Sequence, residues 1–256
     1  MMSSISKNGW IPCSKPNPGA ALRLFCFPYA GGGASTYYGW GDALPREVEV
    51  CPIQLPGREM RLAEPAFTRM ELLLEALAPA ISPYLDRPFA FFGHSMGATI
   101  AFELARTLRT RGELSPIHLF VSGSRAPHIP SPRPPTYHLP DAEFVEELRR
   151  FNGTPEAVLQ NAELMELFTP LLRADLALHD TYRYVDGDPL DCPISAFGGL
   201  GDEEVGQSAI TAWDQHTNGP FMLRMLPGDH FFLRSARRSL LDMVSRDLMQ
   251  NLATAN

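Results

Sequence analysis

The chain has 256 residues, of which 45% are hydrophobic and 20% charged, a composition typical of a globular protein with one large domain. Its net charge of −7 argues against binding to the phosphate backbone of nucleic acid, because that binding needs a basic surface. No apolar run reaches the roughly 18 residues that span a bilayer. The N-terminal stretch also lacks the apolar core of a signal peptide. We therefore expect a cytoplasmic protein that binds neither nucleic acid nor a membrane.

The four cysteines are scattered and form no C-x-x-C pair, so neither a zinc site nor a disulfide framework is expected. Three of them, Cys26, Cys51 and Cys192, fall in strand-like segments, where cysteine acts as a small apolar core residue. The fourth is Cys13. We expect no metal and no organic cofactor.

Short apolar runs alternate with helical stretches, which is typical of an α/β fold with a mostly parallel sheet flanked by helices. Most of the runs are apolar on both faces, as in strands that helices cover on both sides. The strands are expected over residues 21–27, 48–53, 88–92, 117–122, 193–197 and 221–226. The clearest helices are expected over residues 68–85, from Met96 onward and over residues 235–252.

One stretch, residues 125–189, interrupts the alternation because it contains no convincing strand; we call it the cap segment. A proline-rich stretch leads into helices expected near residues 141–151, 155–159 and 162–184. We interpret the cap segment as a helical insertion that covers one end of the sheet within a single domain. Its apolar residues at helical spacing either line a pocket or pack the segment against the core. They are Phe144, Leu148, Leu164, Met165, Phe168, Leu171 and Leu172.

The strongest local motif is G-x-S-x-G, formed by Gly93, Ser95 and Gly97 between a strand and a helix. This strand–turn–helix context is what a nucleophile elbow requires, because the glycines leave room for backbone crowded around the serine. The positive end of the following helix would also stabilise an oxyanion formed there. We expect Ser95 to be a nucleophile; the alternative is a glycine-rich turn with an inert serine.

A serine hydroxyl needs a base to take its proton and an acid to orient that base. In this kind of fold the acid and then the histidine follow the serine, each after a later strand. Asp202 and His230 occupy these places, each at the end of a turn that follows a strand. The alternative acids are Glu203 and Asp229. No other histidine follows the last strand; the others are His94, His118, His128, His138, His179 and His216.

An oxyanion hole needs two backbone N–H groups, one of them on the residue after the nucleophile. That residue is Met96. The loop after the first strand, Tyr-Ala-Gly-Gly-Gly, offers exposed backbone for the second, and Ala30 is the expected donor. A phosphate-binding loop is excluded there, because neither G-x-G-x-x-G nor G-K-[ST] is present.

Taken together, several motifs resemble the type II, stand-alone thioesterases of polyketide and nonribosomal peptide synthesis, which have the α/β-hydrolase fold. The motifs are FPYAGGGAS, QLPGREMRLAEP, GHSMGA, the RPPTYHLPDAEFVEEL stretch of the cap segment, GGLGDEEV and LPGDHFFL. The resemblance extends from about residue 21 to residue 248. It implies hydrolysis of acyl or aminoacyl groups from the phosphopantetheine arm of a carrier protein. It places the nucleophile on Ser95, the acid on Asp202, the base on His230 and the oxyanion donors on Ala30 and Met96.

Other hydrolase functions stay open: an esterase or lipase acting on free esters, or a terminal cyclising thioesterase. A non-catalytic binding module of the same fold is the alternative outside enzymes. We expect a monomer that binds acyl- or peptidyl-carrier domains.

Two groups of charged residues have open roles. We interpret the first group, Arg58, Glu59 and Arg61, as an ion-paired loop that supports the sheet edge. The alternative is that these residues contact the carrier or the substrate directly. For carrier docking we favour Arg149 and Arg150 over the second basic cluster, and a solvated helix face is the alternative for both. The second cluster is Arg106, Arg109 and Arg111.

Overall fold

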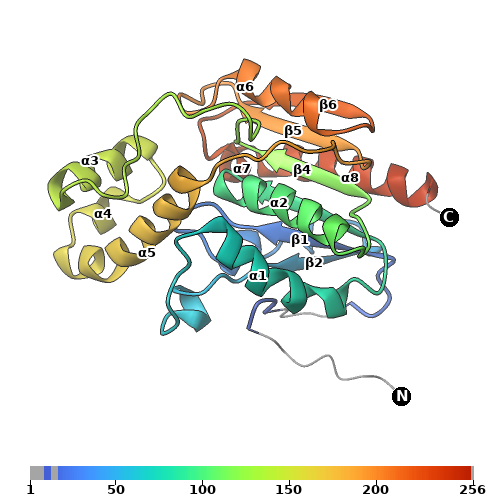
Figure 1. The fold of residues 1–256 in the computed structure, drawn as a ribbon, viewed down its shortest axis with the longest axis horizontal. Coiled ribbons are helices and arrows are strands. Elements are labelled where there is room, and N and C mark those ends of the chain that lie inside the picture. Colours follow the sequence, from blue (N-terminus) through green and yellow to red (C-terminus); the bar gives the residue numbers. More distant parts are fainter. Residues whose placement is uncertain (1–8, 13–16, 255–256) are drawn as a thin grey trace.

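A six-stranded parallel sheet forms the centre of the computed structural model, which describes residues 9–12 and 17–254 (Figure 1). The strand order is β2-β1-β3-β4-β5-β6. The strands are β1 Leu22–Phe27, β2 Val48–Pro52, β3 Phe89–His94, β4 His118–Ser122, β5 Ile194–Gly199 and β6 Phe221–Leu226. All six lie where the sequence predicts them, with ends that differ by at most two residues.

Helices cover both faces of the sheet, which explains why its inner strands are apolar throughout. Every residue of β1, β3, β4 and β5 is buried. One apolar cluster joins the sheet to α1 (Met70–Ile81) and α2 (Met96–Thr110), and a second joins its other face to α8 (Arg237–Thr254). The shorter helices are α6 Gln207–Thr211, α7 Phe232–Ser235 and the 3₁₀ turns Ala34–Tyr37, Glu59–Arg61, Ser82–Tyr84 and Ala212–His216.

Outside the cap segment, the helices before β3 and at the C-terminus differ from the sequence prediction at their ends. The helix expected over residues 68–85 ends at Ile81 and continues only as a 3₁₀ turn. Pro83 explains this end, because it has no N–H to donate to the carbonyl oxygen of Pro79, four residues earlier. The C-terminal helix begins at Arg237, since residues 232–235 form the separate helix α7.

The cap segment contains the three helices expected there, between β4 and β5 in the chain. They are α3 Asp141–Phe151, α4 Glu156–Leu159 and α5 Ala162–Thr181, the last ending three residues earlier than predicted. They lie together at the left of Figure 1 and share an apolar cluster of their own. Residues that follow β1, β3, β4, β5 and β6 line one pocket with residues of this segment. The segment therefore lies at the carboxyl ends of the strands.

The described cysteines, Cys26, Cys51 and Cys192, are buried. Cys26 and Cys51 lie in β1 and β2 as expected, but Cys192 precedes β5, so its assignment to a strand is wrong. Cys13 and most of the N-terminal stretch used in the signal-peptide argument lie outside the described residues. Among the described helices, none combines the length and apolar character needed to span a membrane.

Candidate active site

Ser95 lies at the sharp turn between β3 and α2, with a positive φ of 53°. Non-glycine residues rarely adopt this conformation, so the turn is strained. The flanking glycines are required by close packing. A Cβ on Gly93 would lie 2.1 Å from the Gly97 carbonyl oxygen, and one on Gly97 would lie 2.1 Å from the Phe27 oxygen. The G-x-S-x-G motif therefore forms the elbow that its sequence context predicts.

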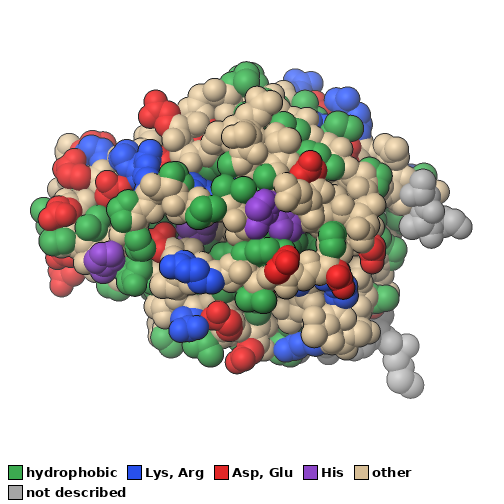
Figure 2. Space-filling model, turned by 45° about the horizontal axis from the view of Figure 1, so that its top comes forward, with side chains coloured by type: hydrophobic (Ala, Val, Ile, Leu, Met, Phe, Trp, Pro, Cys, Tyr) green, Lys and Arg blue, Asp and Glu red, His purple; other side chains and the backbone are tan. Residues whose placement is uncertain are grey.

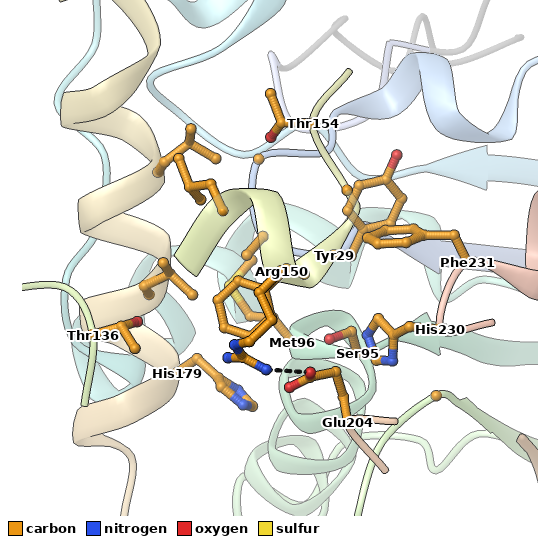
Figure 3. Close-up of a pocket in the computed structure, with 18 of the residues that line it drawn as sticks. Tyr29, Ser95, Met96, Thr136, Arg150, Thr154, His179, Glu204, His230 and Phe231 are labelled. Atoms are coloured by element: carbon orange, nitrogen blue, oxygen red, sulfur yellow. Dashed lines mark hydrogen bonds and ion pairs between the residues drawn. The ribbon is translucent and has the colours of Figure 1, made fainter. Parts of the chain in front are cut away.

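The two expected partners of Ser95 are brought together from β5 and β6. His230 Nδ1 lies 2.8 Å from Asp202 Oδ2, and the Asp202 side chain has no exposed surface. The second carboxylate oxygen accepts the backbone N–H groups of Glu204 at 2.8 Å and Val205 at 3.1 Å. These bonds fix the carboxylate, which in turn orients the imidazole. Figure 3 shows His230 beside Ser95 at the edge of the pocket.

The alternative acids point elsewhere. Glu203 is exposed. Asp229 accepts the Phe231 N–H at 2.8 Å and the side-chain amide of Asn152 in the cap segment at 3.2 Å. Neither contacts the His230 ring nitrogen that Asp202 occupies.

The neighbouring histidine, His94, is fully buried, and its Nδ1 lies 2.9 Å from Ser122 Oγ. Burial holds its pKa well below the usual value, and the charges of His230 and Arg234 lower it further. The neutral, buried imidazole of His94 therefore packs next to the turn that carries Ser95 and takes no charge there.

The two expected oxyanion donors belong to residues that line the pocket near Ser95. Ala30 and Met96 both line it, and neither N–H donates a hydrogen bond to another part of the chain that the structure describes. The adjacent Gly31 N–H is already taken, because it donates to Asp175 Oδ2 at 2.7 Å. The Ala30 N–H is therefore available as a donor, and its role in an oxyanion hole stays a prediction.

A buried ion pair fastens the Ala30 loop to α5. Arg58 donates to both carboxylate oxygens of Asp175 at 2.7 Å and to the Gly32 carbonyl oxygen at 3.0 Å. Both side chains are at most 4% exposed. Glu59 accepts the Ser35 hydroxyl. The geometry favours the structural interpretation of this motif, with one difference: Arg58 supports the Ala30 loop and the cap segment rather than the sheet edge.

The pocket has a volume of about 350 Å³ and lies between the ends of the strands and the cap segment. Four residues of the apolar stripe line it, and three do not. The lining residues are Leu148, Phe168, Leu171 and Leu172. Phe144 and Met165 are buried inside the segment's own apolar cluster. The pocket interpretation therefore holds for four members, whereas Phe144 and Met165 pack within the cap segment and not against the core of the sheet.

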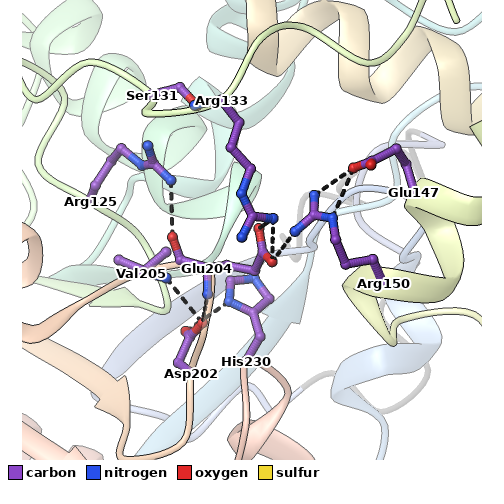
Figure 4. A network of polar contacts seen from close by, with 9 residues as sticks. All are labelled: Arg125, Ser131, Arg133, Glu147, Arg150, Asp202, Glu204, Val205 and His230. Atoms are coloured by element: carbon purple, nitrogen blue, oxygen red, sulfur yellow. Dashed lines mark hydrogen bonds and ion pairs between the residues drawn. The ribbon is translucent and has the colours of Figure 1, made fainter.

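Glu204, which the sequence analysis did not single out, connects the two sides of the pocket (Figure 4). Its carboxylate accepts a hydrogen bond from the Arg133 guanidinium at 2.9 Å and also pairs with Arg150; both arginines belong to the cap segment. Arg125 donates to its backbone oxygen at 3.2 Å. Burial raises the pKa of Glu204. Glu204, two residues after Asp202, thus ties the cap segment to the β5 side of the pocket by ion pairs.

The arginines favoured for docking are already paired. Arg149 pairs with Glu146 and Glu156, and Arg150 pairs with Glu147 as well as Glu204. In the second cluster Arg106 pairs with Glu103, and Arg109 donates to two backbone oxygens. In Figure 2 acidic and basic side chains are mixed over the cap segment at the left. These contacts speak against Arg149 and Arg150 as a free basic patch.

Comparison with known proteins identifies the family of the chain. The family model "Thioesterase domain" matches residues 22–248. The gramicidin S biosynthesis protein GrsT of Aneurinibacillus migulanus is 48% identical over 253 residues, covering 98% of this chain and 99% of that protein.

Solved structures agree with the sequence matches. The RedJ thioesterase from the prodiginine pathway of Streptomyces coelicolor has a TM-score of 0.84 at 43% identity, covering 90% of this chain and 87% of that one. YbtT, a type II thioesterase from the yersiniabactin NRPS/PKS pathway, has a TM-score of 0.82 at 32% identity, with 93% and 96% covered.

Proposed function

The chain belongs to the thioesterase family, and we propose that it hydrolyses acyl or aminoacyl thioesters on the phosphopantetheine arm of carrier proteins. It is a hydrolase of the type II class that serves polyketide and nonribosomal peptide synthesis. Such hydrolysis would clear stalled or wrongly primed carriers, which is the task that the resemblance to type II thioesterases implies. We further propose that it works as a cytoplasmic monomer.

The proposed reaction has two steps, and the first is acylation. Ser95 Oγ attacks the thioester carbon while His230 Nε2 accepts its proton, and Asp202 stabilises the imidazolium. The oxyanion accepts the N–H groups of Ala30 and Met96. The C–S bond then breaks, and the proton passes from His230 to the leaving sulfur, which departs as the carrier thiol.

The second step frees the enzyme. Water attacks the acyl-serine carbon, and His230 takes a proton from that water. The same two N–H groups hold the second oxyanion. Breakage of the C–O bond returns the proton to Ser95 and releases a carboxylic acid.

The main support for this mechanism is the 2.8 Å contact between Asp202 and His230, beside the strained Ser95, in a pocket with two free N–H donors. Turnover of an acyl-carrier protein against a nitrophenyl ester of the same acyl group tests the substrate class. We expect the carrier thioester to have the higher kcat/KM. A higher value for the free ester would identify an esterase. Failure to react with a fluorophosphonate would identify a non-catalytic module.

A further inference from the structure

Two polar atoms in the wall of the pocket lack hydrogen-bond partners. They are Thr136 Oγ1 and His179 Nδ1, both enclosed by protein. Among the residues that the structure describes, only one other buried side-chain atom, His94 Nε2, is unpartnered in this way. Buried polar atoms without partners are rare, because each costs about 1–3 kcal/mol. Two of them in one wall point to a ligand.

Both atoms lie on the cap-segment side, in the same pocket as Ser95 and His230 (Figure 3). The backbone N–H of Thr136 donates to Asp180 Oδ2 at 2.9 Å, which fastens the proline-rich loop to α5 beside His179. Thr136 is only 8% exposed. The two side chains are therefore held in a fixed part of the wall.

His179 is neutral near pH 7. Burial lowers its pKa, and the charges of Arg125 and His230 lower it further, against the opposing charge of Asp180. A neutral imidazole has one donor and one acceptor nitrogen, and a threonine hydroxyl both donates and accepts. A hydroxyl group complements both side chains, whichever tautomer His179 adopts.

Charge narrows the choice of ligand group. Four arginines line the same pocket, against two carboxylates among its described lining residues, Asp180 and Glu204. An ammonium group on the acyl chain would be repelled by this excess of guanidinium groups. A neutral oxygen substituent avoids that repulsion.

We propose that Thr136 and His179 form a specificity subsite that binds a hydroxyl group on the acyl chain. The subsite makes hydroxyacyl thioesters better substrates than plain alkyl or aminoacyl thioesters. This inference rests on the proposed function, because it assigns the substrate class of the same pocket.

The test compares N-acetylcysteamine thioesters of octanoate with those of octanoate hydroxylated at carbon 3, 5 or 7. The wild type should prefer at least one hydroxylated thioester by about 5- to 100-fold in kcat/KM, as one or two satisfied buried groups would give. Thr136→Val and His179→Leu should each reduce this ratio toward one. Thr136→Val should also raise kcat/KM for plain octanoate, because it leaves no hydroxyl unsatisfied.

Thr154→Val is the matched control, since Thr154 lines the other end of the pocket and should leave the ratio as in the wild type. A wild type without preference, or a preference that survives both Thr136→Val and His179→Leu, would overturn the subsite.

A second measurement separates this outcome from failure of the proposed function. In a Ser95→Ala background, thermal stabilisation by each thioester reports binding without turnover. Stronger stabilisation by a hydroxylated thioester, lost with Thr136→Val, would support the subsite even in an enzyme that hydrolysed none of them. Equal stabilisation by all would overturn it.

Discussion

The sheet and the cap segment are held together by different forces. In the sheet, aromatic rings such as those of Phe25, Phe27 and Phe91 are fully buried and contact one another edge to face. The ring centroid of Phe91 lies 5.9 Å from that of Phe25 and 5.2 Å from that of Phe27. The cap segment has a small apolar cluster, and charged contacts such as Arg58–Asp175 and Arg150–Glu204 tie it to the rest.

The difference separates two tasks. Residues proposed for chemistry follow strands whose positions are fixed by dense packing, so their geometry is preorganised. Residues proposed for selection lie on a segment that joins the main apolar core at Ala126 and Leu178, whereas polar contacts such as Arg150–Glu204 tie its helix α3 to the rest. We therefore expect α3 to open at lower free energy than the strands. Four measurements test this division.

The largest effect is expected on the sheet side. Ser95→Ala and His230→Ala should each lower kcat by several orders of magnitude, and the double variant by little more, because the groups act as a unit. Asp202→Asn should be severe too, since it leaves His230 in the wrong tautomer. Steady-state turnover of an acyl-carrier protein measures this. Near-normal turnover by Ser95→Ala would falsify the nucleophile assignment.

The next effect concerns the ion pair between the regions. Arg58→Ala leaves the Asp175 carboxylate buried without its partner, which should lower the free energy of unfolding by about 3–5 kcal/mol. The double variant Arg58→Met with Asp175→Leu should be much closer to the wild type. Urea unfolding provides the measurement, with the exposed Arg69 of the Arg69–Glu71 pair as control. An Arg58→Ala effect no larger than that of Arg69→Ala would contradict this account.

A smaller effect, in the sheet alone, depends on pH. Burial lowers the pKa of His118 on β4 to about 4, with the Arg224 charge lowering it and Asp247 opposing. Below pH 6.5 the unfolded chain binds a proton that the folded protein does not. This group alone should therefore lower the free energy of unfolding by about 1.4 kcal/mol per pH unit between pH 6.5 and 4. In His118→Gln, the free energy of unfolding measured with urea should depend less on pH over this range. An unchanged slope would contradict the role of His118.

The smallest effect concerns opening of the cap segment. Amides of α3 should exchange with deuterium at lower free energy than those of β3. Glu204→Gln should lower the α3 value by a further ~1 kcal/mol, because it weakens both arginine contacts, and leave β3 unchanged. Glu203→Gln, the exposed neighbour, serves as control. If α3 is as protected as β3 in the wild type, the cap segment belongs to the rigid core.

Local patterns explain how far the sequence alone could predict the molecule. The strands and the Ser95 elbow have short-range signals: apolar runs, flanking glycines and a strand–helix junction. Asp202 and His230 were found from their places after later strands. The site assignment itself remains a prediction that the kinetic variants test.

Contacts between distant residues carry no such signal. Arg58 and Asp175 are 117 positions apart, and nothing local marks their pairing. The sequence presents Arg150 as part of a basic pair, and nothing local marks Glu204, 54 positions away, as its partner. His179 does not follow the last strand, and only the folded chain shows that it lines the pocket.

The carboxylate of Asp175 has a consequence for protein engineering. It occupies the Gly31 N–H and neutralises Arg58 at once, so the backbone around Ala30 takes its shape from a residue on α5. A chimera that receives the cap segment of another enzyme therefore needs a carboxylate at this place. Without that carboxylate, the transplanted segment would change the pocket and also distort the Ala30 loop. The substrate range could then not be exchanged without a change in catalytic rate.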